Sequence, residues 1–410
     1  MMSIKGAVLF AQSGGPTSVI NASAYGVITA ALGSELVTRV YAAANGIVGA
    51  LAGRLFDVSA EDRAELALLP GTPSSAFGSC RYKLKPREED DTDYKKLLGL
   101  FRKYDIRYFF YNGGNDSMDT CDKVSRYFES VGYECRVAGV PKTIDNDLVG
   151  TDHAPGFGSA AKYIATSVAE TALDSRVYDT PAVTVVEAMG RHAGWLAGSA
   201  SLASLTGAGA DLVYLPEVGF DLERFKSDVN AVYSRGGKAL IVISEGIRYA
   251  DGGFVADAPV PSTDGFAHAQ LGGAASKLAD VLKDALKCKA RAIELSLLQR
   301  CASHIASQTD VDEAVAVGRF AAEQAFAGKS GFMAAIDRVS DSPYKTALAA
   351  KPLSAAANAE SKVPRDWINA DGNGVTQRFI DYALPLIQGE FAQPKENGLP
   401  RFARLKKVLI

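Results

Sequence analysis

Short runs of apolar residues recur along the whole chain, and each run is followed by turn-forming residues and an amphipathic stretch. The run Ala239–Ile243 is typical, because it is apolar at every position instead of alternating with polar residues. Continuous runs of this kind are characteristic of strands that are buried on both faces of a parallel sheet. The alternation of such strands with helices predicts layers of α/β structure with mostly parallel sheets.

The positions of the expected elements follow from this pattern. Strands are predicted over residues 5–11, 37–43, 107–112, 135–140, 182–187, 211–215, 238–244, 290–297 and 332–336. Helices are predicted over residues 18–32, 92–104, 117–131, 158–173, 191–204, 221–235, 267–287, 309–327 and 374–392. We assign the first four strands to one sheet and the strands from residue 182 onward to a second. Residues 338–373 show little periodicity and are expected to form long connections or a surface insertion.

Composition excludes several classes of protein. The chain has 410 residues, enough for two domains, and its net charge of −3 comes without a dense basic cluster, so we expect no nucleic-acid partner. No apolar run approaches the ~20 residues that a membrane span requires. The five cysteines form no CxxC pair and the histidines show no ligand spacing. This cysteine usage predicts a cytoplasmic protein without a structural zinc site.

Glycines and polar residues gather where the predicted strands end, the edge at which such folds bind ligands. Residues 13–16 (SGGP) and 113–117 (GGNDS) each lie between a strand and a helix. Glycines there allow backbone N–H groups to approach a phosphate at a helix N-terminus. The simpler alternatives are a plain turn and an N-cap formed by Asp116 or Ser117. A carboxylate beside a phosphate also calls for a cation, so we expect Asp116 to bind Mg²⁺.

The most specific segment is residues 141–147 (PKTIDND), which closes another strand. A kinase that acts on an alcohol needs a carboxylate to accept the hydroxyl proton. Asp145 and Asp147 offer one base and one orienting or metal-linked partner. An arbitrary acidic turn is the alternative, but the neighbouring glycine-rich strand end favours a phosphoryl-transfer site.

Two further strand ends and several arginines complete the pattern. Residues 187–194 (EAMGRHAG) place an arginine and glycines where a small phosphorylated ligand could be clamped. Residues 244–246 (SEG) add Glu245 as an acceptor for sugar hydroxyls. Arg81, Arg291 and Arg300 gain meaning only within this larger pattern, because isolated arginines are usually solvated.

The five segments SGGPTSVIN, GGNDS, PKTIDND, EAMGRHAG and SEG, in this order, resemble the phosphofructokinase family from about residue 5 to about residue 335. The resemblance implies two Rossmann-like three-layer α/β/α domains. Residues 1–158 plus about 299–350 would bind the phosphoryl donor, and about 159–298 plus 351–410 would bind the sugar. It also implies transfer of a phosphoryl group to O1 of fructose 6-phosphate, with Mg²⁺ at the donor.

The resemblance also implies residue roles. Asp145 would accept the proton, Asp147 would assist, and Arg81 would stabilise the transferring charge. Gly15 and Gly114 would line the donor. The residues implied to bind the sugar phosphate are Thr143, Ile144, Met189, Gly190, Arg191, Glu245, Arg291 and Arg300. One of the last two arginines often reaches in from a neighbouring subunit in this family, which implies a homodimer or a homotetramer.

Two residues indicate which donor is used, because members that use ATP carry glycines where this chain has Asp116 and Lys142. A carboxylate at position 116 would occupy and oppose the place of an α-phosphate. Two like charges ~4 Å apart cost roughly 4 kcal/mol at an effective dielectric of ~20, or about a thousandfold in affinity. Lys142 suits a compact, highly charged diphosphate, and both residues match the pyrophosphate-dependent branch.

Three alternatives stay open at this point. One is an ATP-dependent enzyme of the same fold. Another is a non-catalytic regulatory subunit, and the last is a related kinase that acts on NAD or a lipid. The chain also departs from the family at Asn115, where many members have a metal-binding aspartate, and at Ala182, where bacterial ATP enzymes place an arginine that crosses between subunits.

Overall fold

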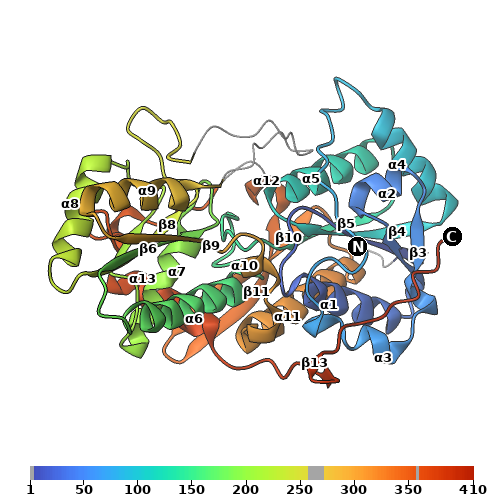
Figure 1. The fold of residues 1–410 in the computed structure, drawn as a ribbon. Coiled ribbons are helices and arrows are strands. Elements are labelled where there is room, and N and C mark those ends of the chain that lie inside the picture. Colours follow the sequence, from blue (N-terminus) through green and yellow to red (C-terminus); the bar gives the residue numbers. More distant parts are fainter. Residues whose placement is uncertain (1–3, 257–271, 357–359) are drawn as a thin grey trace.

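The structure is a computed structural model, and it describes residues 4–256, 272–356 and 360–410. Two separate sheets form two lobes that lie side by side (Figure 1). The larger sheet has the order β11-β10-β5-β4-β1-β2-β3. Its strands are β1 (Gly6–Gln12), β2 (Val37–Ala43), β3 (Leu55–Asp57), β4 (Ile106–Gly113), β5 (Arg136–Pro141), β10 (Phe332–Asp341) and β11 (Tyr344–Pro352). Only β3 and β11, at the two edges, run antiparallel to their neighbours within this sheet.

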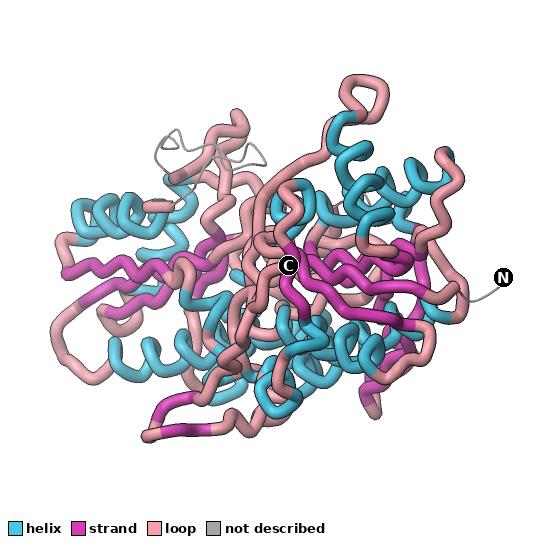
Figure 2. The backbone as a smooth tube through the Cα atoms, turned by 90° about the vertical axis from the view of Figure 1, so that its right-hand side faces the viewer, coloured by secondary structure: helices cyan, strands magenta, loops and turns pink. Residues whose placement is uncertain are grey.

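The larger sheet is buried on both faces, as continuous apolar strands require. In β1, Val8 and Phe10 pack toward α1 (Ile20–Leu32) and α11 (Gln308–Phe326), while Leu9 and Ala11 pack toward α4 (Thr92–Lys103) and α5 (Asn115–Ser130). Successive strand residues point to opposite faces, so one strand contributes to two cores. The result is a three-layer α/β/α lobe, and Figure 2 shows helices above and below both sheets.

The smaller sheet repeats this plan. Its order is β7-β8-β6-β9 and all of its strands are parallel. One face packs against α6, α7 and α13, and the other against α8 and α9. These elements are β6 (Ala182–Ala188), β7 (Leu212–Tyr214), β8 (Lys238–Ser244), β9 (Lys289–Glu294), α6 (Phe157–Ser175), α7 (Trp195–Ser199), α8 (Leu222–Tyr233), α9 (Ala274–Leu286) and α13 (Gln377–Ala383).

After β9 the chain returns to the first lobe, and two glycines allow α11 to pack closely against α1 there. A Cβ atom on Gly26 of α1 would come within 2.2 Å of the Val315 carbonyl oxygen. A Cβ atom on Gly318 of α11 would come within 2.1 Å of the Ser23 carbonyl oxygen. The two helices therefore pack backbone against backbone, and α11 leads directly into β10 beside β5.

The assignment of all strands after residue 182 to the second sheet was therefore wrong, because β10 and β11 join the first. The expectation of long connections over 338–373 was also wrong in part. Strands β10 and β11 form an antiparallel hairpin that reaches Pro352. The second strand, YKTALAAKP, lies at a sheet edge, where lysines and small residues replace the apolar run that marks a central strand.

Two predicted helices are shorter than expected. The helix predicted over 191–204 begins only at Trp195 and becomes a 3₁₀ helix at Ala200–Thr206. Its first residues form a turn instead, because Gly190 has a φ of 121°. The helix predicted over 374–392 is α13 followed by a 3₁₀ turn at Leu384–Ile387, where Pro385 ends the α-helical pattern. Residues 267–271 of the helix predicted over 267–287 lie outside the described residues.

Candidate active site

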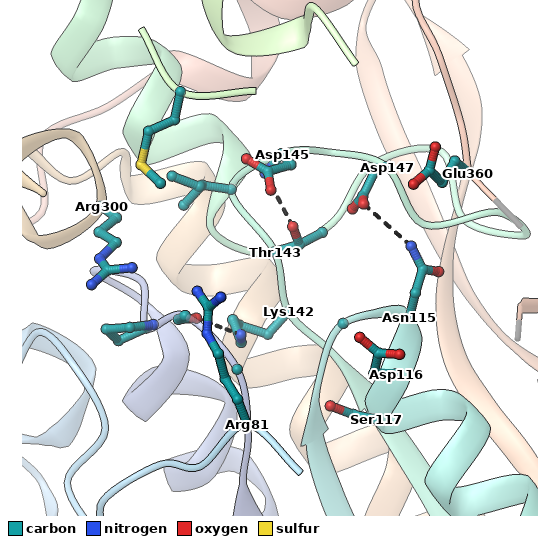
Figure 3. A pocket seen from close by; sticks show the side chains of 16 residues that line it. Arg81, Asn115, Asp116, Ser117, Lys142, Thr143, Asp145, Asp147, Arg300 and Glu360 are labelled. Atoms are coloured by element: carbon teal, nitrogen blue, oxygen red, sulfur yellow. Dashed lines mark hydrogen bonds between the residues drawn. The ribbon is translucent and has the colours of Figure 1, made fainter. Parts of the chain in front are cut away.

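A cavity of about 490 Å³ lies where the strand ends of both lobes converge (Figure 3). It gathers most of the residues that the sequence predicts for the site. Its predicted members are Gly15, Arg81, Gly114, Asp116, Lys142, Thr143, Ile144, Asp145, Asp147, Met189 and Arg300. Gly14, Pro16, Asn115 and Ser117 also line it, and they belong to the two glycine-rich segments that the sequence places at the site, whereas Glu360 comes from outside every predicted segment.

The glycine-rich turn after β4 forms one wall of this cavity. Gly114 occupies the N-cap position of α5 with no side-chain cap, so neither Asp116 nor Ser117 is the N-cap residue. Asp116 lies in the first helical turn, and its carboxylate is 3.4 Å from the Lys83 ammonium. The backbone N–H groups at the start of this helix favour a bound anion. Asp116 would repel that anion unless nearby cations balance the negative charge of the Asp116 carboxylate.

Lys142 supplies a buried cation at the same end of the cavity. Its ammonium donates a hydrogen bond to the Gly15 carbonyl at 2.5 Å and is 3% exposed as a residue. Burial lowers the pKa of Lys142 to about 7, although the negative charge of Asp145 opposes this change. In Figure 3, Arg81 lies next to this lysine and Arg300 lies beyond Arg81 on the same side. A ligand with several negative charges would balance the positive charges of these three side chains.

The two predicted carboxylates occupy the loop that follows β5. The Thr143 hydroxyl accepts a hydrogen bond from the Asp145 N–H at 3.1 Å, and the Asp147 carboxylate accepts one from the Asn115 amide at 3.2 Å. Asp145 Oδ1 is buried and receives no hydrogen bond from the described residues. Burial raises the pKa of Asp145 to about 7, and the charge of Asp147 adds to this effect. A carboxylate with this pKa can take up a proton near neutral pH.

The second lobe contributes the segment after β6. The Met189 N–H donates to the Gln299 side chain at 3.1 Å, and the Gly190 N–H points to Glu245 at 3.4 Å. Burial raises the pKa of Glu245 to about 8, with a further contribution from the charge of Asp145. The guanidinium of Arg191 lies 5.6 Å from the ring centroid of Phe254. Gly190, Arg191 and Glu245 therefore adjoin the cavity through Met189 but do not line it.

Arg291 is the predicted site residue that the structure places elsewhere. It lies on the edge strand β9, 3.9 Å from Asp174, and lines a separate cavity of about 270 Å³. Arg300 lies past the end of that strand and reaches the main cavity. The intervening turn at residues 295–297 separates the two arginines, so one chain brings only one of them to this site.

Glu360 and Lys83 are the neighbours of the predicted acids that sequence reasoning missed. Glu360 pairs with His192 at 2.8 Å. Burial raises the pKa of Asp147, and the charge of Glu360 adds to this effect. The backbone of Glu360 forms a bridge with Leu148 of the acidic loop. Glu360 lies within residues 338–373, which show little periodicity, so no local sequence pattern predicts its place at the site. Lys83 stands two residues after Arg81, and that proximity was its only signal.

A cluster of charged side chains, formed by Asp152, His153, Glu313 and Arg338, holds the segment that follows the acidic loop. His153 is 2% exposed, and its ring nitrogens lie 2.8 Å from Asp152 and 2.7 Å from Glu313. Arg338 also binds the Asp152 carboxylate, at 3.0 Å. Burial alone would lower the pKa of His153, but the hydrogen bonds and charges of its two carboxylate partners raise it to about 9.

This cluster predicts a pH-dependent contribution to stability. Because the folded-state pKa of His153 lies above its unfolded value, the stabilisation is complete below about pH 6.5 and is lost as pH rises through 9. His153→Gln should lower the free energy of unfolding by about 3 kcal/mol at pH 6, and the deficit should shrink toward pH 10. Urea unfolding across this range measures it, and a deficit that is constant with pH would contradict the assignment.

The glycine-rich helix start, the buried Lys142 and the acids that meet at these strand ends are the groups that the site of a phosphotransferase requires. The family model described as phosphofructokinase matches residues 7–324, and the chain belongs to this family. It is 50% identical over 402 residues to a protein of Halomonas elongata named pyrophosphate–fructose 6-phosphate 1-phosphotransferase. The aligned region covers 97% of this chain and 96% of that protein.

Solved structures agree with this family. The pyrophosphate-dependent phosphofructokinase from Marinobacter aquaeolei is 42% identical, with a TM-score of 0.88 over 99% of this chain and 97% of that chain. The corresponding protein from Nitrosospira multiformis is also 42% identical, with a TM-score of 0.89 over 100% and 98%. These values confirm the predicted fold class. Among the helices of the described ranges, none has the length and apolarity needed to cross a membrane.

Proposed function

We propose that this protein is a pyrophosphate-dependent 6-phosphofructokinase. It transfers a phosphoryl group from pyrophosphate to O1 of fructose 6-phosphate, and the products are fructose 1,6-bisphosphate and phosphate. The observation that carries the proposal is the pair of residues at the donor end of the cavity. Asp116 stands in the first turn of α5, and Lys142 is a buried cation bound to the Gly15 carbonyl. The relatives named above support the same donor.

The residues divide into a reacting group and a binding group. Asp145 accepts the O1 proton while O1 forms a bond to phosphorus and the bridging P–O bond breaks, so that phosphate leaves. Lys142 and Arg81 stabilise the charge that moves onto the leaving group, and Asp147 orients the loop. The donor lies against Gly15 and Gly114. The sugar phosphate lies against Thr143, Ile144, Met189 and Arg300, and its phosphorylated end extends from the cavity toward the adjoining Gly190, Arg191 and Glu245. Because the leaving group is phosphate, the reaction runs in both directions, and Asp145 returns its proton in the reverse direction.

Magnesium fits the donor end of this cavity. Mg²⁺ is usually held by one or two carboxylates together with waters and substrate phosphates. Asp116 offers such a carboxylate, and beside it Asn115 has a buried side-chain oxygen that accepts no hydrogen bond from the described residues. Asp116 would hold the metal with the help of Asn115. The bound ion would neutralise charge on the diphosphate.

The domain division follows from these roles. We assign residues 1–158 and about 299–350 to the donor half, and residues 159–298 with 351–410 to the sugar half. The cytoplasmic location expected from the cysteines stays a prediction.

We also propose that the protein works as a homodimer or homotetramer, because Arg291 lies outside its own chain's cavity. It sits on the exposed edge strand β9 near the C-terminal end of α6. Leu173, Val177 and Tyr178 expose between 62% and 70% of their surface there. Apolar side chains this exposed beside an unpaired strand edge favour association, which would bring Arg291 toward a partner's sugar phosphate.

A mixing experiment tests this shared site. Asp145→Asn and Arg291→Ala chains should each have low activity as pure preparations. When the two are unfolded, mixed and refolded together, mixed oligomers should regain activity, because one site then combines an intact Asp145 with the other chain's intact Arg291. Sedimentation velocity establishes the oligomer size. A mixture no more active than its two components would contradict a shared site.

The donor assignment is tested by paired assays on the wild-type protein with Mg²⁺ and fructose 6-phosphate. Turnover with pyrophosphate should greatly exceed turnover with ATP, and adding phosphate to fructose 1,6-bisphosphate should drive the reverse reaction. Faster turnover with ATP would reject the donor assignment. If the protein bound fructose 6-phosphate but showed turnover with neither pyrophosphate nor ATP, a regulatory subunit would be favoured instead.

A further inference from the structure

The residue between the two acids of the catalytic loop has an unusual backbone conformation. Asn146 has a φ of 55°, in the left-handed region that asparagine tolerates better than most residues. It is 3% exposed and does not line the cavity, whereas Asp145 and Asp147 on either side both do. The loop therefore directs its two carboxylates toward the cavity and its central amide into the protein.

Both ends of that amide are engaged. Asn146 Nδ2 donates a hydrogen bond to the Tyr382 hydroxyl at 2.8 Å, and Oδ1 accepts one from the Ala154 N–H at 2.9 Å. The Tyr382 hydroxyl in turn donates its proton to the Asp152 carbonyl at 2.8 Å. Each group thus uses a donor or acceptor that it has available, and Tyr382 joins both ends of the segment from 146 to 152.

Tyr382 is itself held firmly in place. Its ring centroid lies 5.2 Å from that of Trp195 and 5.2 Å from that of Trp367. The Arg338 guanidinium lies 4.6 Å from the same ring and donates to the Tyr382 carbonyl at 3.0 Å. These contacts come from several separate elements, so the tyrosine provides a rigid anchor for the loop.

We propose that Asn146 and Tyr382 are positioning residues that hold Asp145 at the reacting hydroxyl. Neither side chain lines the cavity, so they act through the loop and not on the substrate. The proposal rests on the proposed function, in which Asp145 accepts the O1 proton. Proton acceptors must be placed within a few tenths of an ångström, and small displacements reduce rate more than they reduce substrate affinity.

Tyr382→Phe removes the hydroxyl and keeps the ring within its aromatic cluster. We expect kcat with pyrophosphate and fructose 6-phosphate to fall about tenfold, while KM for pyrophosphate changes less than about twofold. Tyr214→Phe is the matched control. Tyr214 and Tyr382 are both 8% exposed, and the Tyr214 hydroxyl donates a hydrogen bond at 2.9 Å to Asp228, away from the catalytic loop. That variant should retain kcat within about twofold.

A double-mutant cycle separates positioning from general stability. Asn146→Gly allows the same φ but deletes the amide, so it should lower kcat by about tenfold or more. If the Tyr382 hydroxyl acts through Asn146, adding Tyr382→Phe to this variant should change kcat less than about twofold. A further tenfold loss, or a kcat unchanged in Tyr382→Phe alone, would overturn the proposal.

Tryptophan emission provides the structural readout. The chain has two tryptophans, and both contact the Tyr382 ring. An unchanged emission spectrum in Tyr382→Phe would show that the cluster is intact. If the spectrum shifts, Asn146→Gly alone carries the test, and wild-type kcat in that variant would overturn the proposal. Absence of pyrophosphate turnover in the wild type contradicts the proposed function instead, so the two failures are distinguishable.

Discussion

Asp145→Asn should lower kcat with pyrophosphate by at least ~10²-fold, because it removes the group that accepts the O1 proton. The asparagine side chain has nearly the same shape, and the backbone N–H of residue 145 can still donate its hydrogen bond to the Thr143 hydroxyl. Affinity for pyrophosphate should therefore change much less than turnover. Steady-state kinetics in the direction of fructose 1,6-bisphosphate formation measures both. Unchanged turnover would remove Asp145 from the role of base.

The pH dependence gives this prediction a second readout. Because the pKa of Asp145 is raised to about 7, kcat/KM of the wild type should rise with pH through that value as the base becomes ionised. The variant should lose this limb of the profile.

Stability should move in the opposite direction from activity. The raised pKa means that the folded state holds a proton on Asp145 that the unfolded state releases between about pH 4 and 7. Wild-type stability therefore falls as pH rises through this window, and the penalty is complete above about 7. Asp145→Asn lacks the penalty and should have the higher Tm at pH 8, with the advantage disappearing near pH 4. A variant less stable than the wild type at pH 8 would contradict the burial argument.

Changing Asp116 and Lys142 to glycine together should convert the donor preference. Pyrophosphate-dependent kcat/KM should fall by roughly a thousandfold, because a charge contact worth about 4 kcal/mol is lost. Use of ATP should rise, because the carboxylate that opposes an α-phosphate is gone. Removing Lys142 also frees the Gly15 carbonyl, which its ammonium now occupies at 2.5 Å.

The single variants identify which residue excludes the nucleotide. Asp116→Gly should allow some ATP use and lower pyrophosphate use moderately, whereas Lys142→Gly should lower pyrophosphate use without admitting ATP. Lys83→Ala is a useful comparison, since it removes the ion-pair partner of Asp116 but leaves the carboxylate in place. Its ATP activity should stay low. If the double variant gains no ATP activity, other residues must exclude the nucleotide.

The sequence predicted the strands and the glycine-rich turns well, because their causes are local. An apolar run of strand length followed by glycines and acids determines where a strand ends, and parallel strands place such ends at one edge. This local pattern predicts that Gly114, Lys142 and Asp145 lie together, and all three line one cavity. It failed at β11, whose edge position removes the apolar pattern, and at the short α7, where Gly190 keeps the chain in a turn.

By itself the sequence determined the class of fold, the order of the strand ends and the acids and cations that those ends carry. Only the tertiary structure decided which distant residues complete them. Tyr382 meets Asn146 across 236 positions, and Glu360 reaches the acidic loop from a stretch without periodicity. Arg291 and Arg300 have the same chemistry and lie nine positions apart, yet only one enters the cavity. Side-chain type and local periodicity are properties of a segment, whereas proximity depends on how separate segments pack.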